Sequence, residues 1–349
     1  MQNVRIGFVG VGSMGQCAHL RNYAVLPECE VVALAELRPG LAEAVARKYG
    51  VPRVYGSHEE LFANEEVDAV VAAQPFTRHG TLLPELLQAG KPIFIEKPLA
   101  GSVEQGERVL AAVRDTGTWI MVGYHKRSDP ATVAAMAEIA RLKETGELGK
   151  LKYVRVTMPP GDWIAGGFDD MVRSDEALPP LVMDPGPSNM TAEEHKEYLV
   201  FVNYYIHQVN LLRHLLGEPY RVAHADPSGV VLVARSESGV AGCIEMAPYQ
   251  TTVDWHEEAL VGFEKGYVRL RLPAPLARNR AGEAEFYRDP GDGKAPEVVR
   301  PVLPWVHAMR AQAERFVRAV RGDEEPACGA EEALEDLRIA EQWLWARKG

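Results

Sequence analysis

The sequence predicts an α/β fold in two domains, and three observations support this. In the first part of the chain, apolar runs that suit buried strands alternate with helical segments, as in a doubly wound parallel sheet. A glycine-rich turn joins the first of these strands to the segment that follows it. Beyond residue 150, strand-like runs recur with short turns between some of them, as in antiparallel hairpins. A chain of 349 residues with 46% hydrophobic content can bury two such cores.

Composition excludes several classes of partner. The formal net charge is −11, so nucleic acids and anionic membranes are repelled on average, and a small-molecule partner is expected. The four cysteines lack paired metal-type spacing, which predicts neither a disulfide framework nor a metal site. The first strand begins almost at Met1, and no apolar run approaches the ~18 residues of a membrane span. We therefore expect a reducing, cytoplasmic setting.

The first predicted strand, residues 4–9, leads directly into a glycine-rich turn and then a helix over residues 16–25. In such a unit the first glycine permits the tight turn, the second lets the backbone approach a pyrophosphate, and the third allows close helix packing. The helix N-terminus adds unpaired N–H groups and a positive dipole. The sequence therefore predicts a dinucleotide site formed by Gly10, Gly12, Ser13, Met14 and Gly15.

An acidic residue follows the next predicted strand, residues 31–35. Glu36 stands about 20 residues beyond the last glycine, where a carboxylate binds the adenosine ribose hydroxyls. Because a carboxylate repels a 2′-phosphate, Glu36 favours NAD over NADP. Arg38 keeps NADP open as the less favoured alternative, since its side chain could reach a phosphate or simply lie exposed at the start of a helix.

The alternation continues with predicted strands at residues 67–73, 92–95 and 119–122 and a helix at 82–89. Ligands of parallel sheets bind at the carboxyl ends of the strands. The segments at those ends are Gln74-Pro75, Glu96-Lys97-Pro98 and Tyr124-His125-Lys126-Arg127. Lys97 can serve as a cation over the cofactor crevice or as an ion-pair partner of Glu96, and its position alone does not decide between them.

A single helix is predicted from about Ala192 to Leu216. Thr191 and Glu194 have capping-box spacing, and Gly217 is a helix stop. At ~3.6 residues per turn, one face of this helix carries a polar stripe. That stripe consists of Asn203, His207, Asn210 and His214. It indicates either a ligand-facing edge or a solvated face with a satisfied histidine.

These motifs together resemble the Gfo/Idh/MocA oxidoreductases. The resemblance rests on Gly10 to Gly15, on the run from Ala69 to His79, and on the run from Gln88 to Ala100 that contains Glu96-Lys97-Pro98. Residues 146–151 and 325–337 look like later parts of the same family. The resemblance implies an N-terminal Rossmann domain over residues 1–125. It also implies a C-terminal α+β domain, residues 126–349, on a large, mostly antiparallel open sheet.

The resemblance implies roles for particular residues. Lys97 is expected to be catalytic, and His207 matches the family's histidine, but Asn203 stands where the family places an aspartate. The cofactor-binding residues are expected to be Gly10, Gly12, Ser13, Met14, Gly15, Glu36, Arg38, Gln74, Pro75, His79, Glu96 and Lys97. The substrate-binding residues are expected to be Asn203, Tyr204, His125, Arg127, Trp163 and Asn210.

The implied reaction needs a base and a cation. Oxidation of an alcohol carbon requires a group that takes the hydroxyl proton, and an unperturbed histidine titrates near ~6.5. His207 is the expected base, and Lys97 would stabilise developing alkoxide. Without the usual carboxylate, either His207 is a weaker base or Lys97, Tyr204, Tyr205 or His125 shares the proton transfer.

The sequence therefore predicts an NAD-dependent oxidoreductase acting on a hydroxyl of a sugar, polyol or sugar derivative. One alternative is a glycoside-cleaving enzyme that oxidises and re-reduces its sugar without net cofactor turnover. Another is a nucleotide-sensing regulator without catalysis. In the resembling family the exposed face of the open sheet commonly forms a subunit interface, so a homodimer or homotetramer is expected.

Overall fold

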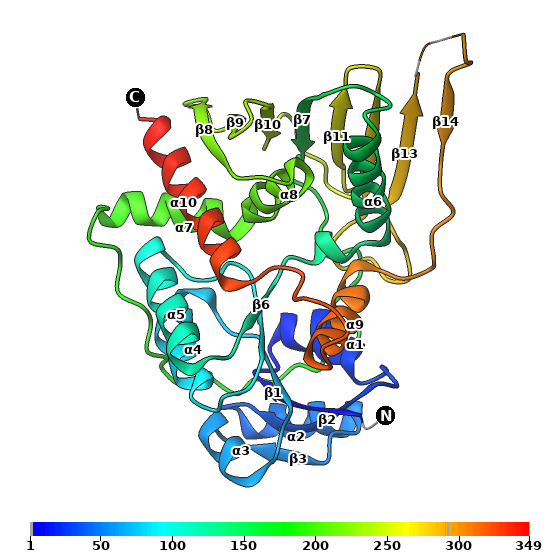
Figure 1. Ribbon diagram of the computed structural model, residues 1–349. Helices are drawn as coiled ribbons and strands as arrows, with labels where there is room; N and C mark the ends of the chain where they lie inside the picture. Colours follow the sequence, from blue (N-terminus) through cyan, green and yellow to red (C-terminus); the bar gives the residue numbers. More distant parts are fainter. Residues whose placement is uncertain (1–2, 290, 292, 349) are drawn as a thin grey trace. The chain divides into compact units, whose positions relative to one another are not determined.

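The computed structural model describes residues 3–289, 291 and 293–348, and the chain forms two compact units. The first unit extends to Tyr124 and also contains Gly166–Asn203 and Gln312–Leu337. The second contains His125–Ala165, Tyr204–Ala311 and the segment from Arg338 onward. Each unit has its own sheet and its own helices (Figure 1).

The first unit contains a six-stranded parallel sheet in the order β3-β2-β1-β4-β5-β6. This order is typical of a doubly wound dinucleotide-binding fold and confirms the predicted α/β class. Apolar runs such as VRIGFV form these strands because both faces of a parallel sheet are buried. The strands are β1 (Val4–Val9), β2 (Cys29–Ala35), β3 (Arg53–Tyr55), β4 (Ala69–Ala72), β5 (Ile93–Glu96) and β6 (Ile120–Gly123).

Two helices of this unit, α3 (His58–Asn64) and α5 (Val103–Thr116), begin at a serine side chain that caps them. Ser57 and Ser102 each accept a hydrogen bond, at 3.2 Å, from the backbone N–H three residues later. The elements are η1 (Gly15–Leu20), α1 (Arg21–Tyr23), α2 (Pro39–Tyr49), α3 (His58–Asn64), η2 (Phe76–Arg78), α4 (His79–Leu87) and α5 (Val103–Thr116).

The helix predicted over residues 16–25 is corrected by the structure. Its first part, η1, is a π-helix, and α1 ends it at Tyr23. Between Tyr23 and Pro27 the chain forms turns, in which the Val25 N–H donates to Asn22 and the Leu26 N–H donates to Tyr23. The spacing of apolar residues in the sequence does not predict that the helix after the glycine motif begins as a π-helix.

The second unit contains an eight-stranded sheet in the order β14-β13-β12-β11-β7-β10-β9-β8. β7 and β10 pair in parallel, whereas the other recorded pairs are antiparallel, which confirms the predicted mostly antiparallel sheet. The strand-like runs expected beyond residue 150 include β7 (Leu151–Thr157), β9 (Val231–Ser236), β10 (Ala241–Glu245) and β12 (Gly266–Leu272). The others are β8 (Tyr220–Ala225), β11 (Glu257–Phe263), β13 (Glu283–Arg288) and β14 (Glu297–Val299).

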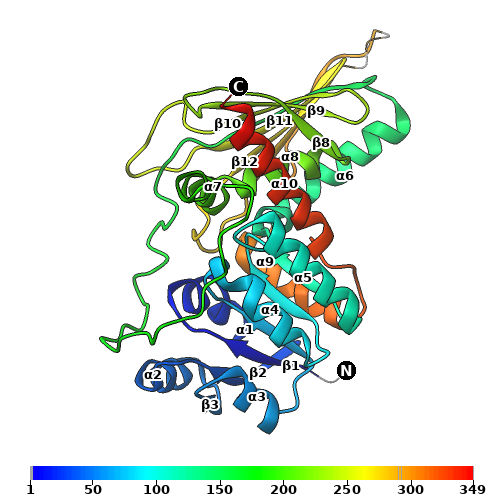
Figure 2. The same cartoon turned by 90° about the vertical axis from the view of Figure 1, so that its left-hand side faces the viewer.

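Two helices, α6 (Pro130–Thr145) and α8 (Ile206–Leu216), pack against this sheet (Figure 2). Alternate residues of β7, including Val154 and Val156, are buried, as a half-covered strand requires. The last helices of the chain are α9 (Ala308–Val320) and α10 (Ala330–Ala346), each of which has residues in both units, and η3 (His125–Ser128) precedes α6. In the part of the chain that the structure describes, no helix has the length and apolar character that a membrane crossing requires.

The single helix predicted from Ala192 to Leu216 is wrong, because the structure has two helices there. The capping box is present: Thr191 N donates to Glu194 at 2.7 Å, and Glu194 N donates to the Thr191 hydroxyl at 3.3 Å. However, α7 (Ala192–Tyr204) ends one residue before Tyr205, and α8 starts after it. The Tyr205 hydroxyl donates to the carbonyl of Met246 at 2.7 Å, a contact across the second unit that holds the residue between the helices.

A long segment without helix or strand belongs to the first unit. Residues 166–190, called the strap below, lie between two parts of the second unit in sequence but contact the six-stranded sheet and its helices. Figure 2 shows this green segment passing down to α2. Gln16 fastens it near its start, since the amide of Gln16 donates to the Val172 carbonyl at 3.1 Å and accepts from the Val172 N–H at 3.0 Å.

Candidate functional site

The three glycines of the turn after β1 lie in different surroundings. A Cβ on Gly10, whose φ is +90°, would stand 2.3 Å from the Gln74 amide nitrogen. A Cβ on Gly15 would stand 2.4 Å from the Gly10 carbonyl oxygen. At Gly12 a Cβ would meet no atom within 4 Å. Gly10 and Gly15 are therefore required for local packing, whereas Gly12 borders open space, as a cradle for a pyrophosphate requires.

Glu36 lies at the carboxyl end of β2 and is only 5% exposed. Its carboxylate accepts a hydrogen bond from the Val11 N–H at 3.0 Å, which ties it to the glycine turn. The Arg38 guanidinium donates to it at 2.8 Å. The hydrogen bond to Glu36 raises the pKa of Arg38. Arg38 is thus held by Glu36 inside the first unit.

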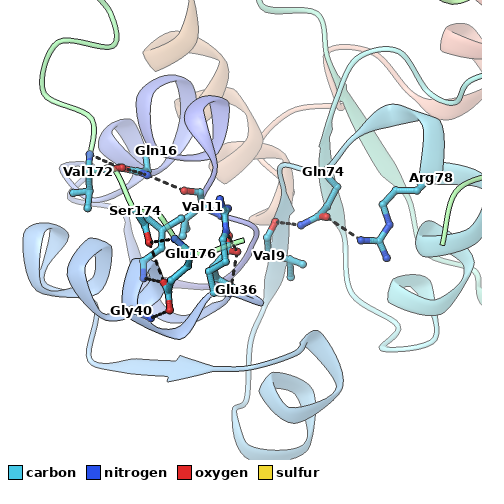
Figure 3. A network of polar contacts seen from close by, with 12 residues as sticks. Val9, Val11, Gln16, Glu36, Gly40, Gln74, Arg78, Val172, Ser174 and Glu176 are labelled. Atoms are coloured by element: carbon cyan, nitrogen blue, oxygen red, sulfur yellow. Dashed lines mark hydrogen bonds and ion pairs between the residues drawn. The ribbon is translucent and has the colours of Figure 1, made fainter. Parts of the chain in front are cut away.

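These residues line a cavity of about 370 Å³ within the first unit. Gly10, Gly12, Glu36 and Arg38 form one part of its wall, and Gln74 and Pro75 form another. The Gln74 amide donates to the Val9 carbonyl at 3.3 Å and accepts from Arg78 at 3.4 Å (Figure 3). The strap completes the wall with Leu178 and Leu181. A cavity of this size, with both apolar and polar side chains in its wall, suits the adenosine end of a dinucleotide.

Other predicted cofactor residues lie outside this wall. Ser13 is exposed and Met14 half-buried at the start of the helix. His79 is fully buried, and its Nδ1 lies 3.2 Å from the carbonyl oxygens of both Pro98 and Leu99. Burial lowers the pKa of His79, which keeps the ring neutral near pH 7. His79 therefore supports the loop after β5.

A candidate metal-binding group was not predicted. Among the described residues, His58, Glu59 and Glu85 could together offer ligand atoms, and all three border the same cavity. Both glutamates are exposed, and such groups are common without an ion.

Glu96, Lys97 and Pro98 form the loop at the end of β5, called the EKP loop below. Glu96 is buried, and its carboxylate lies 2.5 Å from Nε2 of His19 in η1 and accepts from the Lys97 N–H at 3.1 Å. The Lys97–Pro98 peptide bond is cis. The Lys97 ammonium donates to the backbone carbonyl of Asn203, at the end of α7, at 2.5 Å. The structure thus brings two predicted site residues, Lys97 and Asn203, together in the first unit.

A second cluster lies in the second unit. The rings of His125 and His207 stand 4.7 Å apart, edge to face. The Arg127 guanidinium donates to the side-chain oxygen of Asn210 at 2.6 Å, and both residues are buried. Four of the predicted site residues therefore meet where η3 packs against α8.

The two aromatic candidates near this cluster have other positions. Tyr204 precedes α8 and forms an edge-to-face pair with Tyr205. Burial raises the pKa of Tyr204, and it raises that of Tyr205 to about 12. Trp163 is half-buried in the segment after β7, and its carbonyl accepts from Leu276 at 3.2 Å.

A buried charge network in the second unit was not predicted. The Lys126 ammonium lies 2.5 Å from the Glu257 carboxylate, with side chains 4% and 0% exposed. Gln208 and Trp255 donate to the same carboxylate at 2.7 and 3.1 Å. The network ties η3, α8 and β11 together and so fixes the helix that carries His207. Glu257 also borders a cavity of about 800 Å³ whose lining includes Asp162 and Trp255.

The sequence contains a pattern that indicates a buried Glu257, but the pattern is visible only when residues 257–263 are recognised as a strand. In β11, Glu257 shares its face with Ala259, Val261 and Phe263, all buried. A carboxylate in phase with a buried apolar face requires a buried partner. Since β11 was not recognised, this phase was not visible.

Comparisons with known proteins agree with this geometry. Residues 4–124 match the Gfo/Idh/MocA model, described as an oxidoreductase family with an NAD-binding Rossmann fold. An inositol 2-dehydrogenase of Rhizobium meliloti is 32% identical over 54% of this chain and 58% of its own length. A scyllo-inositol 2-dehydrogenase (NAD(+)) of Bacillus subtilis is 26% identical over 69% of this chain and 66% of its own length. The matched regions thus cover about three fifths to two thirds of these relatives.

Solved structures share the fold over almost the whole chain. An aldose-aldose oxidoreductase of Caulobacter crescentus, complexed with glycerol, has a TM-score of 0.71 at 20% identity and covers 99% of this chain and 98% of its own. A mutant 3-ketoreductase of Actinomadura kijaniata, solved with NADP, has a TM-score of 0.68 at 17% identity and covers 97% of this chain and 96% of its own. These structures show the fold of the chain, and its Rossmann region, residues 4–124, carries the match to the Gfo/Idh/MocA oxidoreductase family.

Proposed function

We propose that this protein is an NAD-dependent dehydrogenase that transfers hydride between a hydroxyl-bearing carbon of a sugar, polyol or sugar derivative and nicotinamide. The observation that carries the proposal is the EKP loop, where the Lys97 ammonium is fixed by the Asn203 carbonyl at the carboxyl edge of the dinucleotide-binding sheet. The related enzymes named above act on inositols and aldoses, which places polyols first among the substrates to test.

The residues of the cavity fit a dinucleotide and favour NAD. Gly12 borders open space where a pyrophosphate needs a close backbone approach. In this proposal the Glu36 carboxylate accepts from ribose hydroxyls, and it already binds Arg38, the cation that a 2′-phosphate would need. When bound, the nicotinamide ring supplies the hydride acceptor or donor.

Lys97 and His207 assist the proton transfer in this proposal. Lys97 provides a charge-assisted hydrogen bond to the substrate oxygen, which lowers the energy of developing alkoxide. His207 takes the hydroxyl proton as the general base.

Asn203 contributes its backbone carbonyl to Lys97, so the family's missing carboxylate does not remove this contact. Among the groups considered as partners in proton transfer, His125 is the one whose ring adjoins His207. Tyr205 is less suitable, because its pKa is raised to about 12 and its hydroxyl already donates to Met246. We therefore assign His125 the role of orienting the His207 ring.

The test is a panel of inositols, other polyols and aldoses with NAD and NADP in parallel, read by reduced-nicotinamide absorbance and product identification. Formation of a keto product with stoichiometric NADH supports the proposal. Glycoside cleavage without net NADH would replace it with a redox-neutral lyase or hydrolase. Dinucleotide binding without any turnover on the panel would favour a nucleotide-sensing regulator.

We further propose that the eight-stranded sheet mediates a homodimer or homotetramer. One face of β12 and β13 carries stacked Tyr267 and Tyr287, with ring centres 5.4 Å apart, beside the ion pair of Arg269 and Glu285 at 3.2 Å. Flat aromatic surface flanked by charges is typical of subunit contacts. Light scattering at several protein concentrations measures the state, and a monomer at all of them contradicts the proposal.

A further inference from the structure

The strap inserts a carboxylate at the start of α2. Glu176 accepts hydrogen bonds from the backbone N–H groups of Gly40, at 3.0 Å, and Leu41, at 2.8 Å. The Ser174 hydroxyl donates to the same carboxylate at 3.1 Å. Figure 3 shows Glu176 and Gly40 close to Glu36. The hydrogen bonds from Gly40 and Leu41 lower the pKa of Glu176, which keeps it ionised at neutral pH.

This position adjoins the ribose end of the proposed cofactor cavity. α2 starts three residues after Glu36, and Glu36 and Arg38 both line that cavity. Two residues beyond Glu176 in the strap, Leu178 lines the same cavity, as does Leu181. The strap therefore contributes two leucines to the cavity wall and holds a negative charge at the start of the helix that follows Glu36.

NADP differs from NAD by one phosphate, esterified to the ribose 2′-oxygen. An enzyme that binds this phosphate next to the second strand needs donors there, and the unpaired N–H groups at the start of the following helix are available donors. In this protein two of those N–H groups already bind Glu176, and the nearby guanidinium of Arg38 binds Glu36. A 2′-phosphate would have to displace both carboxylates and would face their charge.

We propose that Glu176 is a specificity-determining residue that excludes NADP, because its carboxylate occupies the anion-binding start of α2. This inference rests on the proposed dinucleotide-dependent function and adds to it a residue 136 positions from the helix it caps. Glu36 alone selects by binding the 2′-hydroxyl, whereas Glu176 removes the donors that an added phosphate would use.

A second carboxylate of the strap provides a matched control. Asp184 accepts from the N–H groups of Gly80 and Thr81 at 2.9 and 2.8 Å and from the Thr81 hydroxyl at 2.8 Å. It therefore fastens the strap to the start of α4 in the same manner. Asp184→Ala loosens the strap without freeing the N–H groups of α2.

The experiment measures the dissociation constants of NAD and NADP for the full-length protein by calorimetry, without substrate. For Glu176→Ser we expect the ratio of the NADP constant to the NAD constant to fall about tenfold or more, and for Glu176→Gln to fall less. The same ratio in Asp184→Ala should stay within about twofold of the wild type, even where both constants rise.

The outcomes separate this inference from the proposed function. An unchanged ratio in both Glu176 variants overturns the role of Glu176 while NAD binding by the wild type leaves the function standing. An equal fall of the ratio in Asp184→Ala also overturns it, since loosening of the strap would then be sufficient. A wild-type protein that binds neither dinucleotide overturns both. Circular dichroism checks that each variant is folded. Glu176→Gln removes the charge but keeps the size of the side chain, whereas Glu176→Ser removes both.

Discussion

His19 and Glu96 form a buried pair directly beneath the EKP loop, with Nε2 of the ring 2.5 Å from the carboxylate oxygen. Burial acts to raise the pKa of Glu96, but the hydrogen bond with His19 and the charges of His19 and Lys97 outweigh it and hold the pKa below its usual value. The other oxygen of Glu96 accepts from the Lys97 N–H. The pair therefore links the helix after the glycine turn to the loop that carries the proposed catalytic lysine.

We expect His19→Ala to lower both stability and turnover. The substitution leaves a buried carboxylate without its partner, a loss of about 1–3 kcal/mol or more in the free energy of unfolding. Because the folded pKa of Glu96 is depressed, the stability it contributes is present above its unfolded pKa and is lost as the pH falls through the folded value. Denaturant titrations at several acidic pH values give the free energy of unfolding at each pH. In His19→Ala this free energy should depend less steeply on pH than in the wild type. An unchanged slope together with unchanged kcat would contradict a positioning role.

Lys97→Met should abolish most turnover while leaving dinucleotide binding intact. Removing one charge-assisted donor to a developing oxyanion typically lowers kcat by about 10²–10³. The NAD dissociation constant should change by less than about threefold, because Lys97 lies at the strand edge and not in the adenosine cavity. Single-turnover kinetics measure the first quantity and calorimetry the second. Turnover at the wild-type rate would remove Lys97 from the mechanism.

His207→Ala should lower kcat by about 10²–10⁴, the usual effect of losing a general base. Asn203→Asp introduces a carboxylate four residues before the proposed base. A nearby carboxylate stabilises imidazolium, so the acidic limb of the kcat/KM profile should move to higher pH in Asn203→Asp. The limb should be absent in His207→Ala. If His207→Ala keeps wild-type turnover on the true substrate, the base lies elsewhere.

Local sequence was sufficient to predict the strand ends at which the proposed cofactor-binding residues lie. The glycine turn, Glu36 after β2 and the EKP loop after β5 all lie at strand ends, where apolar runs stop at polar residues. The capping box at Thr191 was visible for the same reason, because its two partners are three residues apart. Such features depend on neighbours in the chain.

The features that were missed depend on distant contacts. The apolar periodicity is continuous across Tyr205, and the break between α7 and α8 occurs at a tyrosine whose hydroxyl binds Met246, 41 residues away. The role of Glu176 at α2 likewise depends on a partner 136 residues away. An exposed, proline-rich segment without periodicity predicts a loop, but it does not predict which helix the loop will cap.

Breaking the Lys126–Glu257 pair should be strongly destabilising. Lys126→Met leaves a carboxylate that is 0% exposed without its cation, which is expected to cost about 3–5 kcal/mol in the free energy of unfolding. The double variant Lys126→Met/Glu257→Gln should recover part of this, since the amide carries no charge and its single oxygen can accept from either Gln208 or Trp255, which donate to different oxygens of the carboxylate. The control is Arg114→Met, whose partner Glu331 is 71% exposed, and its effect should be below about 1 kcal/mol. Urea denaturation measures the free energy of unfolding of all three variants. Equal effects in Lys126→Met and Arg114→Met would show that burial of the pair is unimportant.

Asp129→Asn should change how stability depends on pH. Asp129 precedes α6, and burial raises its pKa to about 6, against the hydrogen bonds from Ala131 and Gly282. Because the folded value lies above the unfolded value of ~3.9, the stability linked to protonation is fully present below about pH 4 and is lost as the pH rises through about 6. Both N–H groups lie within 3.0 Å of the same carboxylate oxygen, at 2.8 and 3.0 Å, so an amide oxygen can accept from both.

The wild type should therefore gain stability relative to Asp129→Asn as the pH falls from about 7 to 4. Other titrating groups are common to the two proteins, so the difference between their unfolding free energies isolates Asp129. Urea denaturation at several pH values measures this difference. A difference that is constant across the range would mean that Asp129 titrates at the same pH in the folded and unfolded chain, and that burial at the start of α6 does not disfavour its charge.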